Sequence, residues 1–274
     1  MFDSIAGDYD SLNHILSLDV DKIWRKKALK QIVDAPAPAR VLDLACGTGD
    51  FSIAIAKALS RSHKRVGTPI EAHVKASVKA PVEAPAKAPV EAQVTSTGFV
   101  TGDSGRSDLM TKGHVTGVDL SECMLAVMRE KVQKAGLTEM ISIEEGDGEN
   151  LRFPDNTFDR VTIAFGIRNF ENREKGLREM LRVLKPGGRL VILELSRPEN
   201  KIIRWFYDLY FLHILPKIGG KVSGDKAAYA YLPASVAAFP GKKAFMATMR
   251  EAGFRAVTHK AFTLGICRMY TGEK

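Results

Sequence analysis

One stretch constrains the fold of this chain more than any other: an apolar run that ends at a glycine turn and leads directly into a second apolar segment. The run Val41–Leu44, which includes Asp43, is followed by Gly47-Thr48-Gly49 and by a helix-like segment from Asp50. Because glycine has no Cβ atom, a ligand can approach such a turn closely, and the amides at a helix start point outward. The stretch predicts a nucleotide-cofactor turn, although a Gly-x-Gly can also simply close a strand-to-helix connection.

Apolar runs alternate with longer helix-like segments along the chain, as in a parallel sheet covered by helices on both faces. Each predicted strand is rich in Val, Ile, Leu or Phe and is followed by turn residues. The predicted strands are Arg40–Leu44, His114–Asp119, Met140–Glu145, Phe158–Phe165 and Arg189–Leu195. The pattern therefore predicts an α/β fold.

Two helices have clear boundaries in the sequence. Ser121 is placed to cap a helix over Glu122–Ala135, with Gly136 as its stop, and its apolar positions recur at helical spacing. A second helix carries one apolar face and ends at the turn 185–188, which leads to the next strand. That face consists of Leu177, Met180, Leu181 and Leu184.

Composition excludes several classes of protein. With 274 residues, 45% of them hydrophobic, the chain can bury one substantial core. No run approaches the ~20 apolar residues of a membrane span, and the N-terminus lacks a signal-peptide core, so a cytoplasmic protein is expected. The three cysteines are scattered, which predicts neither a disulfide framework nor a metal site. A net charge of +8 suits an anionic partner or a merely solvated surface and decides nothing alone.

The segment 61–112 differs from the rest of the chain. It contains near-repeats such as 79–85 and 87–92, built from Lys, Ala, Pro, Val and Glu, and only one aromatic residue, Phe99. Such a segment has too little large apolar surface to offset its chain entropy. We predict a disordered or extended insertion within a single domain over 1–274. Without it, Asp119 would follow the glycine turn at the ~20-residue spacing of a ribose-binding acid.

Carboxylates follow the second and third predicted strands. Asp119 can accept hydrogen bonds from two ribose hydroxyls, and because Ser121 fills the helix-cap role more naturally, we assign Asp119 to the ribose. Asp147 and Gly148 offer a carboxylate for an exocyclic amine and an unhindered amide for a ring nitrogen, although a plain turn is an equal alternative. A nicotinamide fingerprint would need glycine at the position of Ser52, so another adenosine cofactor is preferred.

The run Phe165-Gly166-Ile167-Arg168-Asn169 is the most specific of several motifs in this chain. By these motifs the chain resembles class I S-adenosylmethionine methyltransferases, and more narrowly the C-methyltransferases of quinone biosynthesis. The resemblance covers nearly everything outside the insertion. Its other segments are Phe2–Asp10, Asn13–Ser17, Trp24–Lys27, Leu42–Asp50, Phe153–Asp159, Leu184–Leu190, Tyr207-Asp208, Leu215–Gly219, Tyr229–Leu232 and Ala252–Phe254.

This resemblance implies a Rossmann-like, doubly wound, seven-stranded sheet with an antiparallel final strand, completed by a hairpin of Ala256–Phe262 and Cys267–Thr271. It also implies S-adenosyl-L-methionine as cofactor, with no metal. The cofactor-binding residues expected from motif and resemblance together are Asp43, Gly47, Thr48, Gly49, Asp119, Asp147 and Gly148. Some members use a serine where this chain has Ala164, and that contact is not expected here.

The implied reaction is methylation of a ring carbon of demethylmenaquinol, with a polyprenyl benzoquinol or another small molecule as alternatives. Arg168 and Asn169 follow the fourth strand, where they could hold a phenolate oxygen as catalytic residues, or form a surface turn. Tyr229 and Tyr231 are weaker candidates. The aromatic segment after the fifth strand could cover a prenylated quinol or pack as a buried helix. Its members are Trp205, Phe206, Tyr207, Tyr210 and Phe211.

Other functions fit the sequence less well. A noncatalytic adenosine-binding module would bind the cofactor without turnover. A nucleic-acid methyltransferase should show a base-flipping motif of the Asn-Pro-Pro-Tyr type, which is absent, so no nucleic-acid partner is expected. The basic balance suits peripheral contact with an anionic membrane, where prenylated quinols reside. The oligomeric state is left open, with a homodimer as one alternative.

Overall fold

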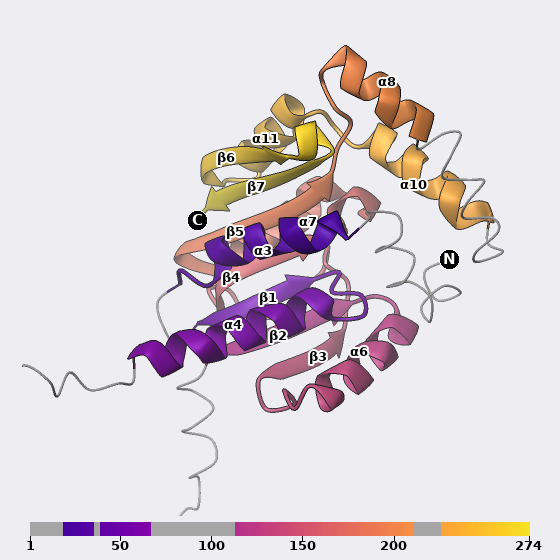
Figure 1. Cartoon of the computed structure of the whole chain (residues 1–274). Helices are drawn as coiled ribbons and strands as arrows, with labels where there is room; N and C mark the ends of the chain where they lie inside the picture. Colours follow the sequence, from indigo (N-terminus) through magenta and orange to yellow (C-terminus); the bar gives the residue numbers. More distant parts are fainter. Residues whose placement is uncertain (1–18, 36–38, 67–112, 211–225) are drawn as a thin grey trace, which may run out of the picture.

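The computed structural model describes residues 19–35, 39–66, 113–210 and 226–274 (Figure 1). Its centre is one seven-stranded sheet with the order β3-β2-β1-β4-β5-β7-β6. Strands β1 to β5 pair in parallel, and β7 pairs antiparallel with both β5 and β6. The strands are β1 Arg40–Leu44, β2 His114–Asp119, β3 Ile141–Glu145, β4 Phe158–Ala164, β5 Leu184–Leu195, β6 Arg255–Phe262 and β7 Cys267–Glu273. The predicted fold class, including the antiparallel final strand, is confirmed.

Helices cover both faces of the sheet. Alternate residues of β1 point to opposite faces: Leu42 packs in one apolar cluster with α7 and α11, and Val41 packs in the other with α3, α4 and α6, which lie on the near face in Figure 1. The helices are α3 Val20–Ile32, α4 Asp50–Val66, α6 Glu122–Lys134, α7 Arg173–Val183, α8 Lys201–Leu209, α10 Lys226–Ala238 and α11 Lys242–Glu251, with short 3₁₀ turns η1 Ile167–Asn169 and η3 Thr263–Gly265.

The predicted cap of α6 is confirmed. The Ser121 hydroxyl accepts a hydrogen bond from the Met124 amide, and Gly136, one residue after the C-cap, has a φ of 65°, which glycine adopts without a Cβ clash. The helix itself ends at Lys134, one residue before the predicted end. The apolar face of α7 is also as predicted for Leu177 and Met180, both fully buried.

Three boundaries were predicted wrongly. Strand β3 begins one residue later, at Ile141, and β4 ends at Ala164 because Phe165 has a left-handed φ of 62° that stops the strand. The expected turn at 185–188 lies inside β5, which starts at Leu184. Lys274 holds it there, since Gly187 N donates to Lys274 O and Lys274 N donates to Gly188 O.

The hairpin of β6 and β7 is slightly longer than predicted. Helix α4 continues to Val66 and so overlaps the start of the predicted insertion 61–112, of which 67–112 lies outside the described residues. None of the described helices combines the length and hydropathy that a bilayer span requires. The described side chains likewise contain no group of three or more His, Cys, Asp or Glu that could hold a metal ion.

Candidate active site

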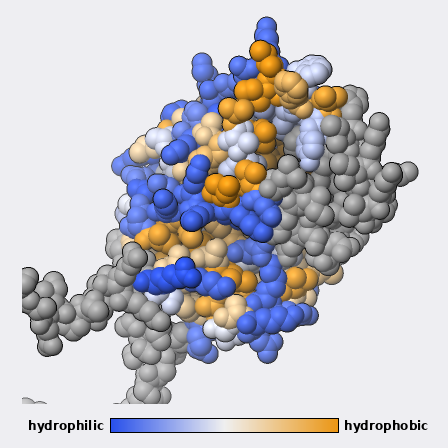
Figure 2. All heavy atoms as spheres, in the orientation of Figure 1, coloured by the Kyte–Doolittle hydropathy of each residue, from blue (hydrophilic) through white to orange (hydrophobic). Residues whose placement is uncertain are grey.

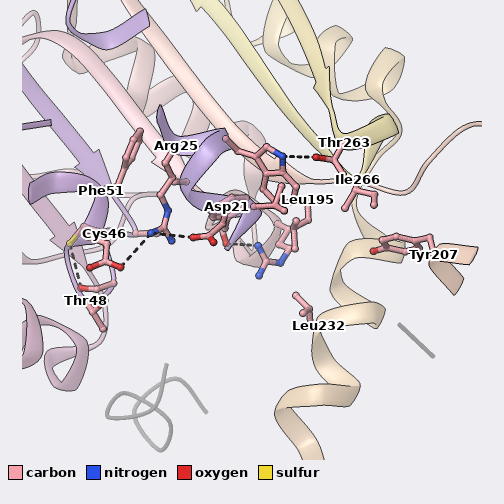
Figure 3. Close-up of a pocket in the computed structure, with 18 of the residues that line it drawn as sticks. Asp21, Arg25, Cys46, Thr48, Phe51, Leu195, Tyr207, Leu232, Thr263 and Ile266 are labelled. Atoms are coloured by element: carbon pink, nitrogen blue, oxygen red, sulfur yellow. Dashed lines mark hydrogen bonds and ion pairs between the residues drawn. The ribbon is translucent and has the colours of Figure 1, made fainter. Parts of the chain in front are cut away.

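A cavity of about 390 Å³ lies at the carboxyl edge of β1, β4 and β5. Its wall comes from α3, the turn after β1, the segment after β4, α8, α10 and η3 (Figure 3). The loops that follow parallel strands converge at this edge, which is where such sheets hold ligands. The wall is mostly apolar and aromatic. Its charged members are Asp21, Arg25, Asp43, Asp50 and Arg168.

The glycine turn after β1 forms one end of the cavity. Gly47 and Gly49 have φ values of 55° and 83°, a conformation that side chains rarely adopt. A Cβ on Gly49 would also lie 2.4 Å from Met128 Cγ of α6, so the turn can pack this close to α6 only with glycine here. Gly47 and the buried Thr48 line the cavity, whereas Gly49 faces α6.

Asp43 lies beneath this turn and is 1% exposed. Its Oδ2 accepts a hydrogen bond of 2.5 Å from the hydroxyl of Ser52, the residue that occupies the third glycine position of a nicotinamide fingerprint. Burial raises the pKa of Asp43 to about 7; the Ser52 hydrogen bond and the Arg25 charge oppose this shift, and the charge of Asp119 adds to it. The floor of the cavity therefore contains a carboxyl group that titrates near neutral pH.

Asp119 ends β2 beside the glycine turn. Its Oδ2 accepts a hydrogen bond of 2.8 Å from Gly47 N, and its Oδ1 accepts one of 3.0 Å from Ser121 N. The two amides fix the carboxylate at the outer side of the turn, next to the cavity rather than on its wall. Asp119 therefore lies beside the glycine turn, as its spacing from the turn without the insertion predicted.

Asp147 and Gly148 lie in the turn after β3, away from the wall of this cavity. Asp147 is exposed, and its Oδ1 accepts a hydrogen bond of 2.8 Å from Glu149 N, so it makes the turn that the alternative interpretation allowed. Gly148 has a packing reason to be glycine, because a Cβ there would lie 2.6 Å from Phe170 Cζ.

Arg168 lines the cavity from η1, and its side chain is 7% exposed. Its Nη1 forms an ion pair with Glu194 Oε1 at 2.7 Å and also donates to the carbonyl oxygen of Phe165. Its backbone N donates to Glu194 Oε2 at 3.1 Å. Glu194 was not predicted from the sequence. Its position at the end of a predicted apolar strand was the only available signal, because a carboxylate buried there needs a cation.

The next residue, Asn169, does not line the cavity but joins η1 to α10. Its Oδ1 accepts a hydrogen bond of 2.8 Å from the Tyr231 hydroxyl, and Arg168 Nε donates to Ser235 Oγ at 3.3 Å. Two residues of α10 therefore hold the two predicted catalytic residues. Of the weaker tyrosine candidates, Tyr231 makes this contact, and the side chain of Tyr229 lies outside the described residues.

Charged residues from α3 enter the site and were not predicted. Arg25 Nη1 lies 3.5 Å from Asp21 Oδ2 and 3.4 Å from Asp50 Oδ2. Lys131 of α6 forms an ion pair with Asp50 and lies 3.3 Å from Thr48 Oγ1. These contacts fasten α3 and α6 to the start of α4. The motif Trp24-Arg25 was visible in the sequence. The pairing of Lys131 with Asp50 was not, because these residues lie 81 positions apart.

The rest of the cavity wall is mostly aromatic and aliphatic. Trp24 lies 6.2 Å from Phe165 between ring centroids, and its Nε1 donates to Thr263 Oγ1 at 2.9 Å. The members of the predicted aromatic segment have different surroundings. Phe206, Tyr207 and Tyr210 line the cavity, Trp205 is 61% exposed, and Phe211 lies outside the described residues. The Ala164 methyl group also contributes to the wall.

Comparison with known proteins decides the family. A model described as the ubiE/COQ5 methyltransferase family matches residues 1–274. The chain belongs to the ubiE/COQ5 methyltransferase family.

Named relatives agree with this assignment. The chain is 42% identical over 274 residues to the ubiquinone/menaquinone biosynthesis C-methyltransferase UbiE of Geobacter sulfurreducens, covering all of this chain and 87% of the relative. It is 37% identical to the demethylmenaquinone methyltransferase of Bacteroides fragilis, covering all of this chain and 91% of the relative. The enzyme of that name from Thermus thermophilus is 36% identical, with both chains fully covered.

Solved structures support the fold alone. A SAM-dependent methyltransferase from Aquifex aeolicus superimposes with a TM-score of 0.52 at 18% identity, covering 90% of this chain and 88% of that one. The [4+2]-cyclase SpnF superimposes with a TM-score of 0.55 at 16% identity, covering 90% and 80%. Because a protein named as a cyclase shares the fold, the fold by itself does not specify the reaction.

As a member of the ubiE/COQ5 methyltransferase family, the protein is a C-methyltransferase with S-adenosyl-L-methionine as its cofactor. The structure brings only part of the predicted site onto one wall. The predicted residues that line the cavity are Asp43, Gly47, Thr48 and Arg168, and those outside its lining are Gly49, Asp119, Asp147, Gly148 and Asn169.

Proposed function

We propose that this methyltransferase acts on demethylmenaquinol and methylates a ring carbon of the naphthoquinol. One observation carries the proposal: the cavity lined by the glycine turn has mostly apolar walls and one buried guanidinium, that of Arg168. An aromatic quinol with an apolar tail can pack against such walls, and its oxygen can pair with the Arg168 guanidinium. The names of the relatives from Bacteroides fragilis and Thermus thermophilus favour the same acceptor.

The residues present fit the cofactor. Gly47 and Thr48 present a turn that a ligand can approach closely, and the carboxylates of Asp43 and Asp119 lie beneath it and beside it. We infer that Gly47 and Thr48 contact the cofactor and that Asp119 binds its ribose hydroxyls. Gly49 allows the turn to pack on α6, while Asp147 and Gly148 follow β3 at the same sheet edge, where an adenine would lie. Bound S-adenosyl-L-methionine supplies an electrophilic methyl group on a positively charged sulfur.

On the acceptor side, the chain must favour the ionised quinol. Loss of a hydroxyl proton makes the ring carbon nucleophilic, and the Arg168 guanidinium stabilises the resulting negative charge on oxygen. Asn169 fixes the position of η1 through Tyr231. Trp24, Phe165 and Tyr207 exclude water and orient the ring. The new carbon–methyl bond would form as the sulfur–methyl bond breaks, with the electron pair left on sulfur. The ring carbon would then lose its proton and the oxygen would regain one, which restores the aromatic ring.

The acceptor also indicates where in the cell the enzyme must work. A prenylated quinol is dissolved in a membrane, and we infer that a cytoplasmic enzyme of this kind must contact the membrane surface to receive it. A polyprenyl benzoquinol is the second candidate acceptor, since the relative from Geobacter sulfurreducens carries both quinone names.

The test is transfer of a labelled methyl group to reduced demethylmenaquinol and to a demethylated polyprenyl benzoquinol. Faster methylation of the naphthoquinol is expected. Arg168→Lys should lower kcat about 100-fold, because a lysine cannot replace a guanidinium that contacts Glu194, Phe165 and Ser235 at once. Arg178→Lys, at an exposed arginine, is the matched control and should leave kcat unchanged. Cofactor binding without product on either quinol would overturn the proposal.

Asp119→Asn tests the ribose assignment separately. The amide keeps an acceptor for the Gly47 amide but loses the charge, so the KM for the cofactor should rise about tenfold with a smaller effect on the acceptor. Glu139→Gln, an exposed carboxylate at the opposite edge of the sheet, is the matched control. An unchanged cofactor KM in Asp119→Asn would remove this residue from the cofactor site.

A further inference from the structure

Exposed apolar side chains are concentrated on the elements that line the cavity. Among the described residues, seven large hydrophobic side chains are exposed, and six of them lie on elements that line the cavity. We call these six the apolar rim. They are Ile23 of α3, Ile202, Trp205, Phe206 and Leu209 of α8, and Leu264 of η3.

The three elements of the apolar rim are joined by hydrogen bonds. Trp24 Nε1 of α3 donates to Thr263 Oγ1 of η3 at 2.9 Å. The segment just before α8 is joined to η3 because Ser196 N donates to Ile266 O at 2.8 Å and Ser196 Oγ donates to Gly265 O at 2.7 Å. The three elements that carry the rim are therefore held next to one another. Figure 2 shows its most prominent part as apolar atoms over α8, at the top of the molecule.

Helix α8 has two apolar faces with different surroundings. Ile203, Phe206 and Tyr207 line the cavity, while Ile202 and Trp205 are 70% and 61% exposed. Leaving a Trp and an Ile in water costs free energy that core packing would recover, so such a patch marks an interaction surface. Tryptophan is also the residue most suited to the boundary between headgroups and acyl chains.

Cations accompany the apolar rim. Lys201 opens α8, and Lys27 of α3 lies 5.0 Å from the ring centroid of Phe262, the residue before η3. Neither is paired with an acidic side chain in the part of the chain that the structure describes. Lys22 is exposed as well, but it pairs with Asp19 at 2.8 Å. Unpaired lysines beside exposed apolar residues complement a surface with negative headgroups.

We propose that the apolar rim is a membrane-docking surface, with α8 inserted at the headgroup boundary of an anionic phospholipid bilayer. Docked in this way, the mouth of the cavity opens toward the acyl layer, so a prenylated acceptor enters without crossing water. This inference rests on the proposed function for its acceptor, whereas binding to lipid can be measured without turnover.

The chain provides its own reporter. It has two tryptophans, of which Trp24 is 4% exposed and Trp205 is 61% exposed. Vesicles of phosphatidylcholine with about one third phosphatidylglycerol should move the emission of Trp205 to shorter wavelength and sediment with the protein. Vesicles of phosphatidylcholine alone should bind it more weakly.

The variant Ile202→Glu with Trp205→Glu removes the outer face of α8 and leaves the residues that line the cavity unchanged. Its affinity for the anionic vesicles should fall at least about tenfold, as measured by sedimentation. The matched control, Gln133→Glu with Thr138→Glu, adds the same two charges at exposed positions far from the rim, where α6 leads into β3. It should sediment with vesicles like the unaltered protein.

Two acceptors separate this inference from the proposed function. With a demethylmenaquinol that carries one isoprene unit in solution, the rim variant should keep its activity. With a long-chain acceptor in vesicles, its activity should fall at least about tenfold.

An unaltered protein that methylates the soluble acceptor without binding vesicles would overturn the docking proposal alone. Vesicle binding without methylation of any quinol would overturn the proposed function alone. If the rim variant instead converts a dimer to a monomer and vesicle binding is unchanged, the rim is a self-interface.

Discussion

The guanidinium of Arg168 and the carboxylate of Glu194 form an ion pair, 2.7 Å between Nη1 and Oε1, in which the two side chains are 7% and 0% exposed. Glu194 accepts two further hydrogen bonds, from the backbone N of Arg168 and from that of Leu195. Three donors thus converge on one buried carboxylate. The arrangement fixes both the charge and the direction of the cation on the cavity wall.

Replacing Glu194 with Gln should therefore harm both stability and turnover. The new amide directs an N–H toward a donor and leaves Arg168 as an uncompensated buried charge, which typically costs about 3–5 kcal/mol. We expect a lower Tm. We also expect kcat to fall by a larger factor than the factor by which the KM for the cofactor changes. Glu194→Asp should recover part of the kcat, because it restores the charge.

The matched control is Glu273→Gln, which removes the 43% exposed partner of Arg189. A surface pair of this kind contributes about 0–1 kcal/mol, so the control should unfold near the temperature of the unaltered protein. If Glu194→Gln lowers Tm but leaves kcat and its pH profile unchanged, Glu194 is only structural.

Stability should depend on pH through Asp43. Its pKa of about 7 in the folded protein lies above the ordinary value of 3.8, because burial disfavours the charged form. Between these two values the folded state binds more protons than the unfolded state, so stability falls as pH rises toward 7. At a pH below the ordinary pKa of 3.8, Asp43 is protonated in both the folded and the unfolded state. The stability that comes from keeping Asp43 neutral is then fully present.

Asp43→Asn removes this titration while keeping an acceptor for Ser52. The free energy of unfolding of the variant, relative to the unaltered protein, should rise by about 2 kcal/mol between pH 5 and pH 7. Urea denaturation at both pH values measures it. Asp155→Asn, at an exposed carboxyl, serves as the control. A difference that stays constant with pH would show that Asp43 is already ionised at pH 5.

The contact of Lys131 with Thr48 and Asp50 predicts an effect on cofactor affinity. Lys131→Gln removes the ion pair that holds the start of α4 and the hydrogen bond of 3.3 Å to Thr48 on the cavity wall. The KM for the cofactor should rise several-fold, and stability should fall by about 1 kcal/mol. Lys134→Gln is the control, since Lys134 is 77% exposed and pairs with Glu130 of its own helix. Equal kinetics in the two variants would contradict this role.

Local sequence patterns were sufficient for most of the fold. The Ser121 cap, the stop at Gly136 and the presence of the five apolar strands follow from interactions within a few residues, and these features were predicted correctly, although three strand boundaries were not. The segment 185–188 was not, because its place in β5 depends on hydrogen bonds with Lys274, about 90 residues later in the chain. Neither glycine in that segment signals such a contact.

The candidate site divides in the same way. Asp43, Gly47 and Thr48 are adjacent in sequence and recognisable as a motif, and they do line the cavity. Arg25 and Glu194 enter the site through tertiary contacts with Asp50 and Arg168, which no local pattern encodes. A buried ion pair needs both partners to be placed by the fold, so its members become visible only when the strands are assembled.

Gly49 gives the sharpest test of the turn, because the chain contains a matched glycine. Gly49 and Gly187 have similar φ values of 83° and 74°, but a Cβ on Gly49 would lie 2.4 Å from Met128 Cγ, whereas one on Gly187 would meet nothing within 4 Å. Gly187→Ala should therefore cost only the strain of a left-handed alanine, about 1 kcal/mol. Gly49→Ala should cost this strain and, in addition, displace Met128 and the turn.

We expect Gly49→Ala to lose about 3 kcal/mol of stability, the upper range for forcing extra volume into a packed site, and to weaken cofactor binding at least about tenfold. Adding Met128→Ala to Gly49→Ala should recover cofactor affinity, because the side chain that the new methyl group strikes is gone, even though the cavity left by Met128 keeps stability low. Calorimetric titration with the cofactor and urea denaturation separate the two effects. If Gly49→Ala and Gly187→Ala behave alike, the close approach of Met128 to this turn is not what requires glycine at position 49.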